Sequence, residues 1–129
     1  MKKILFTMMA VCAMTLCLTS CDNMADPVKE PVAGKQFYSQ DAVGYTEFQF
    51  HMNHVMTLVS RTEIAGNVTT DCWTWSMNNS KVTIKGDSKS AYPGKVVYTG
   101  IYHADTHTLT VTEHVSGSEA TGEFQQAGY

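Results

Sequence analysis

Residues 21–129 are rich in β-strand formers and nearly free of leucine, and this feature constrains the fold more than any other. They hold 11 Val, 13 Thr and 12 aromatic residues, but only two Leu, Leu58 and Leu109. Helical domains draw on Leu, Ala and Glu, whereas Val, Thr and aromatic side chains suit a pleated, half-buried surface. The composition therefore predicts an all-β domain.

Apolar and polar residues alternate along several short segments, which is the periodicity of a strand with one buried face. Turn-forming residues separate these segments. The segments expected as strands are 47–52, 55–62, 72–77, 82–84, 96–102 and 108–115, with weaker ones at 36–39 and 122–126. Six to eight sequential antiparallel strands form a meander. Because closure removes exposed strand edges, we expect a small barrel or half-barrel.

The N-terminal segment has the features of a secretory signal peptide. Lys2 and Lys3 precede an apolar run over 4–18 that is interrupted only by Thr7 and Thr15. The run is shorter than the about 20 apolar residues of a transmembrane helix. A charged start followed by such a run predicts a signal helix over 1–20.

The end of this segment, Leu18-Thr19-Ser20-Cys21, resembles the lipobox of bacterial lipoproteins. The resemblance implies cleavage between Ser20 and Cys21, a diacylglycerol on the Cys21 thiol and an acyl chain such as palmitate on its new amino group. It also implies attachment to a membrane of the cell envelope, with the outer membrane favoured. Asp22 resembles the inner-membrane retention signal of enteric bacteria, so the choice of membrane stays open. The alternative is an ordinary secretory signal followed by a coincidental cysteine.

The remaining chain divides into a spacer and one domain. Residues 21–35 include two Pro, one Gly and five charged residues, which is typical of a flexible or extended tether. Residues 36–129 then form the β domain.

The chain without residues 1–20 is acidic, since it contains seven Lys and Arg residues and 12 Asp and Glu residues. This acidic balance argues against a nucleic-acid partner, because phosphate binding needs a clustered basic face. Cys72 is left without an intrachain disulfide partner.

A second resemblance concerns the domain itself. Over roughly 34–126 the chain resembles small lipocalin-like lipoproteins of Bacteroidetes-type bacteria, most of which are uncharacterised. The segments that carry the resemblance are GKQF at 34–37, FQF at 48–50, TWS at 74–76, KVTI at 81–84 and TLTV at 108–111. It implies an up-and-down barrel that holds a small apolar ligand.

Inward-facing aromatic residues and one carboxylate are the candidate ligand-lining residues. The aromatic side chains either line a cavity or fill the core. Glu113 shares the parity of Leu109 and Val111, so it points into the interior or lies at the barrel rim, where water reaches it. The candidate set is Phe48, Phe50, Trp73, Trp75, Tyr98, Tyr102 and Glu113.

His103, Asp105 and His107 are weak candidates for a metal site in the turn before the 108–115 segment. Two imidazoles and a carboxylate are suitable ligands. The alternative is a surface turn in which His107 takes a positive φ angle, which His tolerates better than most residues. The five histidines share no spacing, so we expect no metal and no cofactor.

The motifs of common enzyme classes are absent from the sequence. It contains no Gly-rich phosphate loop, nucleophile elbow, HExxH helix motif or paired CxxC. We therefore expect a non-enzymatic, lipid-anchored binding module of the cell envelope, with a small apolar molecule, a glycan or a protein as its partner. The alternative is a structural or interaction subunit of an envelope assembly.

Overall fold

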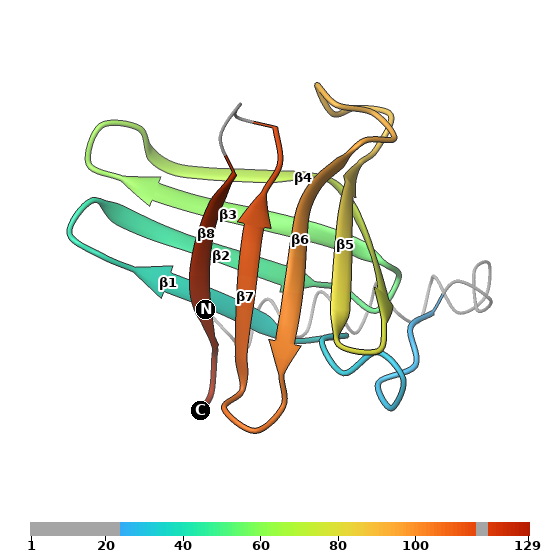
Figure 1. Ribbon diagram of the computed structural model, residues 1–129. Helices are drawn as coiled ribbons and strands as arrows, with labels where there is room; N and C mark the ends of the chain where they lie inside the picture. Colours follow the sequence, from blue (N-terminus) through green and yellow to red (C-terminus); the bar gives the residue numbers. More distant parts are fainter. Residues whose placement is uncertain (1–23, 116–118) are drawn as a thin grey trace, which may run out of the picture.

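The structure, a computed structural model, describes residues 24–115 and 119–129, which form eight β-strands and no helix (Figure 1). The all-β prediction is confirmed. The strands are β1 (Gln36–Gln40), β2 (Gly44–Phe50), β3 (Val55–Thr62), β4 (Gly66–Asn78), β5 (Lys81–Gly86), β6 (Val96–His103), β7 (Thr108–Glu113) and β8 (Ala120–Gln126). The largest boundary difference is in β4, which begins six residues before the expected 72–77 segment.

Each strand pairs antiparallel with the next, and β8 returns to β1, so the sheet is a closed barrel. The predicted meander is confirmed, and of the two expected forms the sheet adopts the closed barrel and not the half-barrel. This architecture is consistent with a lipocalin-like domain. The closing seam is short: only Phe37 with Gln126 and Tyr38 with Gln125 pair across it. The β1–β2 and β3–β4 hairpins extend sideways beyond β8 (Figure 1).

The alternating strand directions give the barrel two distinct ends. Connections 51–54, 79–80 and 104–107 lie at one end, which we call the closed end. Connections 41–43, 63–65 and 87–95 lie at the other, which we call the open end, together with the described residues 114, 115 and 119 between β7 and β8. In Figure 1 the closed end faces down and to the right, whereas the open end faces up and to the left.

Burial of the inward-facing side chains decreases from the closed end to the open end. Along β7, Leu109 and Val111 are buried and Glu113 is half-buried. Along β8, read from the closed end, Gln126 is buried, Phe124 is half-buried and Gly122 is exposed. The core therefore occupies the closed half of the barrel, and the inward-facing side chains become more exposed toward the open end.

Residues 24–35 form a strap that covers the closed end. Val32 is fully buried, and Ala25 and Ala33 are each 6% exposed. The Ala25 N–H donates to the Met52 carbonyl at 2.6 Å, and the Gly34 N–H donates to the Phe50 carbonyl at 2.7 Å. This part of the 21–35 tether is therefore packed into the domain, not flexible or extended, because β2 supplies hydrogen-bond partners and the core accepts its small apolar side chains.

The predicted signal peptide over 1–20, the cleavage between Ser20 and Cys21 and the lipidation of Cys21 lie outside the described residues. Within the described residues, no helix has the length and apolar character needed to cross a membrane.

Candidate functional site

Four aromatic rings form a layer across the interior near the open end: Phe48, Trp73, Tyr98 and Phe124. The Tyr98 ring contacts Phe48 edge to face at 5.3 Å and Trp73 at 5.8 Å between centroids. Phe48 and Phe124 are 5.0 Å apart and nearly perpendicular. Phe48 is buried, whereas the other three are partly buried and pack against the core. We call this group the aromatic layer.

A β-bulge in β4 orients the Trp73 indole. Met56 pairs with Trp73, but Leu58 pairs with Thr70. An advance of two residues along β3 therefore corresponds to three residues along β4, so β4 contains one extra residue. Thr70 and Trp73 therefore both face inward, and the indole N–H donates to the Thr70 hydroxyl at 3.0 Å. Strict alternation places Thr70 on the outer face, which is why the sequence pattern misses it. Phe124 is also missing from the predicted set, although its alternation with Gln126 signals the inner face.

Glu113 adds a carboxylate beside the aromatic layer. It pairs with Tyr98 across β6 and β7 and is half-buried at the last position of β7. Burial raises the pKa of Tyr98 to about 12, with further contributions from the negative charges of Glu113 and Cys72. Glu113 thus lies on the inward-facing side of β7, as its alternation with Leu109 and Val111 predicts, and it also has the solvent access of a rim position. Cys72 is a free, half-buried thiol.

Small side chains line the barrel beyond the aromatic layer. Thr46 and Ser60 face inward and are half-buried, whereas Val68, which pairs with Ser60, and Gly122 are exposed. These residues cannot cover the aromatic rings below them. The interior near the open end therefore presents a partly exposed apolar wall beside the carboxylate of Glu113, which suits a small apolar ligand that carries a cationic group.

The other predicted ligand-lining residues lie in the closed half. Phe50 is 1%, Trp75 3% and Tyr102 7% exposed, and all three belong to the core. The Trp75 indole N–H donates to the carbonyl of His51 at 3.0 Å. These three residues fill the barrel interior, whereas Trp73, Tyr98 and Glu113 stay accessible.

His103, at the end of β6, and His107, in the turn that follows, have separate partners. His103 hydrogen-bonds the Thr110 hydroxyl at 3.0 Å, and the His107 ring stacks on Tyr129 at 3.9 Å. His107 has a φ of 56°, as the surface-turn alternative predicts. Across 24–115 and 119–129 no three His, Cys, Asp or Glu side chains are grouped so that they can hold a metal ion.

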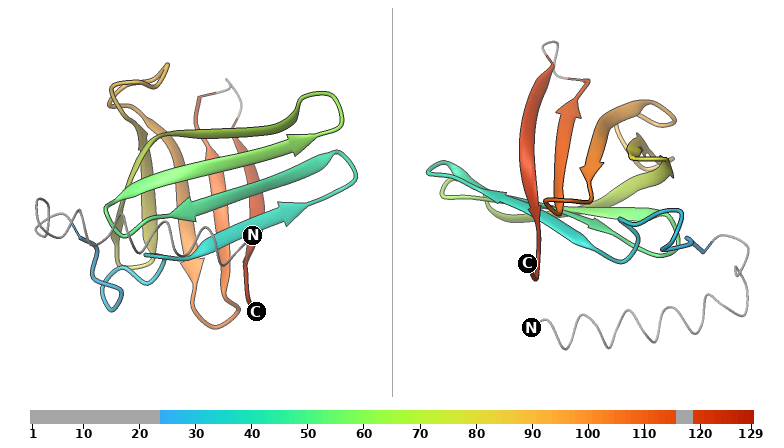
Figure 2. Two further views of the ribbon diagram at one scale, coloured as in Figure 1. Left: turned by 180° about the vertical axis from the view of Figure 1, so that it is seen from behind. Right: turned by 60° about the horizontal axis from the view of Figure 1, so that its bottom comes forward.

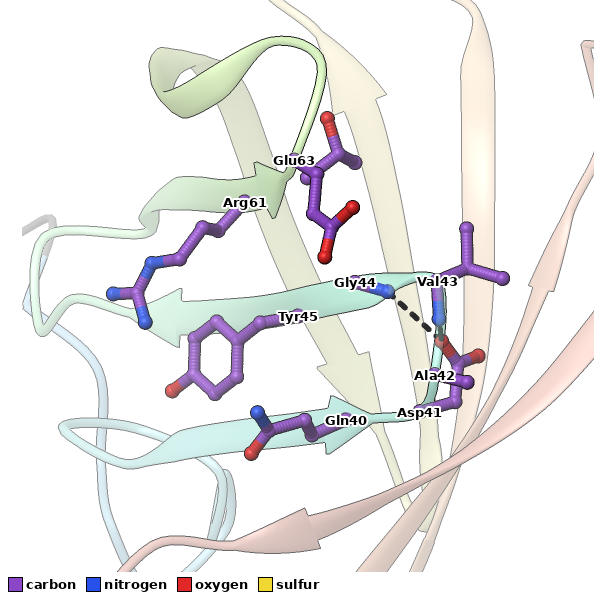
Figure 3. A pocket seen from close by; sticks show the side chains of 9 residues that line it. Gln40, Asp41, Ala42, Val43, Gly44, Tyr45, Arg61 and Glu63 are labelled. Atoms are coloured by element: carbon purple, nitrogen blue, oxygen red, sulfur yellow. Dashed lines mark hydrogen bonds between the residues drawn. The ribbon is translucent and has the colours of Figure 1, made fainter.

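A shallow hollow of about 250 Å³ lies at the tips of the β1–β2 and β3–β4 hairpins (Figure 3). Its lining includes Tyr45, Arg61 and two carboxylates, Asp41 and Glu63. The backbone N–H groups of Gly44 and then Val43 donate to Asp41, which lowers the pKa of this carboxyl group. The Glu63 side chain points toward β2 (Figure 3).

Tyr45 anchors a network on the outer face beside this hollow. The Arg61 guanidinium lies over its ring at 5.2 Å, and the ring stacks on Tyr38 at 6.0 Å. Its hydroxyl donates to Glu47, and burial followed by this hydrogen bond raises the pKa of Tyr45. Because these groups already satisfy one another, the hollow is the weaker of the two candidate sites.

The fold and the site together define a closed, eight-stranded antiparallel barrel with an aromatic layer and a carboxylate at one end. Comparisons of the chain with protein-family models, with curated proteins and with solved structures found no match.

Proposed function

We propose that this protein is a lipid-anchored, non-enzymatic binding module of a bacterial cell envelope, and that the open end of its barrel binds a small apolar molecule bearing a cationic group. The observation that carries the proposal is the half-buried carboxylate of Glu113 beside Tyr98, whose ring in turn contacts Trp73. A carboxylate partly removed from water attracts a cation, and aromatic faces add a cation–π contribution of about 0.5–2 kcal/mol.

The lipid anchor of this proposal rests on the lipobox resemblance at residues 18–21. Two or three acyl chains hold a protein at a bilayer, since each buried methylene contributes about 0.8 kcal/mol. The absence from the sequence of the common catalytic motifs supports a binding role over an enzymatic one.

Charge selection at the open end tests this binding site. The full chain, matured in a bacterial host and purified from membranes, is titrated with phenethylamine and with 3-phenylpropionate, two aromatic probes of opposite charge. We expect the cation to bind more tightly, as measured by tryptophan emission and saturation-transfer NMR. Glu113→Gln removes this preference, whereas Glu123→Gln, on the exposed outer face of β8, retains it. Equal binding of both probes by the unmodified protein contradicts the proposal.

An interaction subunit is the second candidate, and the hairpin tips favour it. Val43 at the β1–β2 tip is 77% exposed, and Ile64 at the β3–β4 tip is 100% exposed. Exposed apolar side chains on neighbouring hairpins are typical of a protein contact. A partner that copurifies in fixed stoichiometry from mild detergent, and that is lost in the Val43→Ser/Ile64→Ser variant, supports this role. Val28→Ser, an equally exposed position at the closed end, is the matched control.

A further inference from the structure

The packed strap leaves little free chain between the predicted lipidation site and the barrel. Ala25, four residues after Cys21, is already buried and hydrogen-bonded to Met52 of the closed end. Because a fully extended chain spans at most about 3.6 Å per residue, these four steps reach about 14 Å. A lipid chain on Cys21 therefore holds the closed end close to the bilayer surface.

The charges of the two ends favour the same orientation. Each connection at the open end carries a carboxylate: Asp41, Glu63, Asp87 and Glu119, with Lys89 and Lys95 as the only lysines there. At the closed end, the strap and connections carry three carboxylates and two lysines, together with three histidines: Asp26, Glu30, Asp105, Lys29, Lys35, His51, His54 and His107. An anionic lipid surface repels the open end more strongly than the closed end.

The closed end also exposes side chains that suit a bilayer interface. Val28, in the strap, is 89% exposed and lies next to Lys29. Tyr129, which stacks on His107, is 77% exposed. Apolar and aromatic side chains beside lysines are typical of contacts at the headgroup level. Figures 1 and 2 show the strap on the side of the barrel opposite the two hairpin tips.

We infer that the closed end of the barrel docks on the lipid bilayer, so that the strap contacts the headgroups and the open end, with the aromatic layer and the hairpin tips, faces away. This inference rests on the lipid anchor of the proposed function. It deepens that function because it leaves the binding site open to molecules arriving from the aqueous side.

Lipid-quenching measurements at two matched positions test the orientation. In a Cys72→Ala background, the full-length lipidated protein carries a fluorescent label on Val28→Cys or Ile64→Cys, both highly exposed in surface turns. The protein is reconstituted into phosphatidylcholine vesicles that contain phosphatidylglycerol and headgroup spin-labelled lipid. We expect the label at residue 28 to be quenched several-fold more than the label at residue 64.

Vesicle flotation, measured on the same samples, separates the orientation from the anchor. Protein that floats with vesicles but shows equal quenching, stronger quenching at residue 64 or none at either position overturns the docking inference and leaves the anchor standing. Protein that does not float overturns the anchor itself, and with it the proposed function. Flotation with preferential quenching at residue 28 supports both.

A longer spacer tests the chain-length argument separately. Inserting a Gly-Ser segment of about ten residues after Asn23 adds a flexible chain with a root-mean-square span of about 17 Å. If the short connection holds the strap on the bilayer, quenching at residue 28 falls while flotation is unchanged. Quenching that persists at full strength shows that the connection length does not set the contact, which overturns this part of the inference.

Discussion

The closed and open ends of the barrel contain similar aromatic residues but bury them to different degrees. At the closed end, Phe50 and Trp75 are 1% and 3% exposed, and the strap covers them with Val32. At the open end, Trp73 and Tyr98 face inward in the same way but remain half-buried, because the strap covers the opposite end of the barrel. A covering segment, more than the residue type, therefore decides which rings are core and which are available to a ligand.

The largest expected effect compares one phenylalanine from each end. Phe50→Ala removes a buried ring from the closed half and is expected to cost about 3–5 kcal/mol of unfolding free energy. Phe124→Ala, in the half-buried part of the aromatic layer, is expected to cost clearly less. Urea unfolding followed by circular dichroism measures both values. Equal losses imply that the two ends are equally well packed.

The strap permits a comparison within a single segment. Val32→Ala removes two buried methyl groups and is expected to cost about 2 kcal/mol. Val28→Ala makes the same chemical change at an 89% exposed position and is expected to change the unfolding free energy by less than about 0.5 kcal/mol. If both substitutions are neutral, the strap does not contribute to the fold and 24–35 behave as a spacer.

The closed end is also expected to lose stability at mildly acidic pH. Burial holds the pKa of His51 below its ordinary value of 6.5, and the nearby Asp71 opposes this shift. As pH falls through 6.5, the unfolded chain takes up a proton before the folded protein does, so the unfolding free energy decreases.

Urea midpoints measured across this pH range test the effect. The His51→Gln variant is expected to show a shallower decrease. His114→Gln, at the open end, leaves His51 in place. This variant should therefore keep the part of the stability loss that His51 causes. If the urea midpoint of His51→Gln falls with pH as steeply as that of the wild type, groups other than His51 cause the loss of stability.

The smallest effect concerns the open end alone. The charge of Glu113 contributes to the raised pKa of Tyr98, but burial is the larger cause. Glu113→Gln is therefore expected to lower the pKa of Tyr98 while leaving it above 10.0. Alkaline absorbance titration measures the shift, and Tyr98→Phe identifies the signal. An unchanged pKa in Glu113→Gln means that the carboxylate does not act on the Tyr98 hydroxyl, which weakens the proposed cation site.

The candidate site was only partly predictable from the sequence. Trp73, Tyr98 and Glu113 follow from alternation, because Trp73 keeps the regular β4–β5 register on one side of the bulge and Tyr98 pairs with Glu113 in the regular β6–β7 register. Thr70 does not, since the bulge shifts its side chain to the inner face and no residue type marks the bulge. Phe50 and Trp75 share the alternation of Trp73, and their local sequence contains nothing to show that the strap covers them.

The sequence by itself determined the all-β class, the order of the strands and the inward direction of most side chains, because these depend on local composition and a two-residue period. The tertiary structure decided the closure of the sheet, the packing of 24–35 under the barrel and the difference between its two ends. These features arise from contacts between residues far apart in the chain. The strap contributes small apolar residues such as Ala25 and Val32, whose burial depends on the C-terminal end of β2 and on the core that receive them.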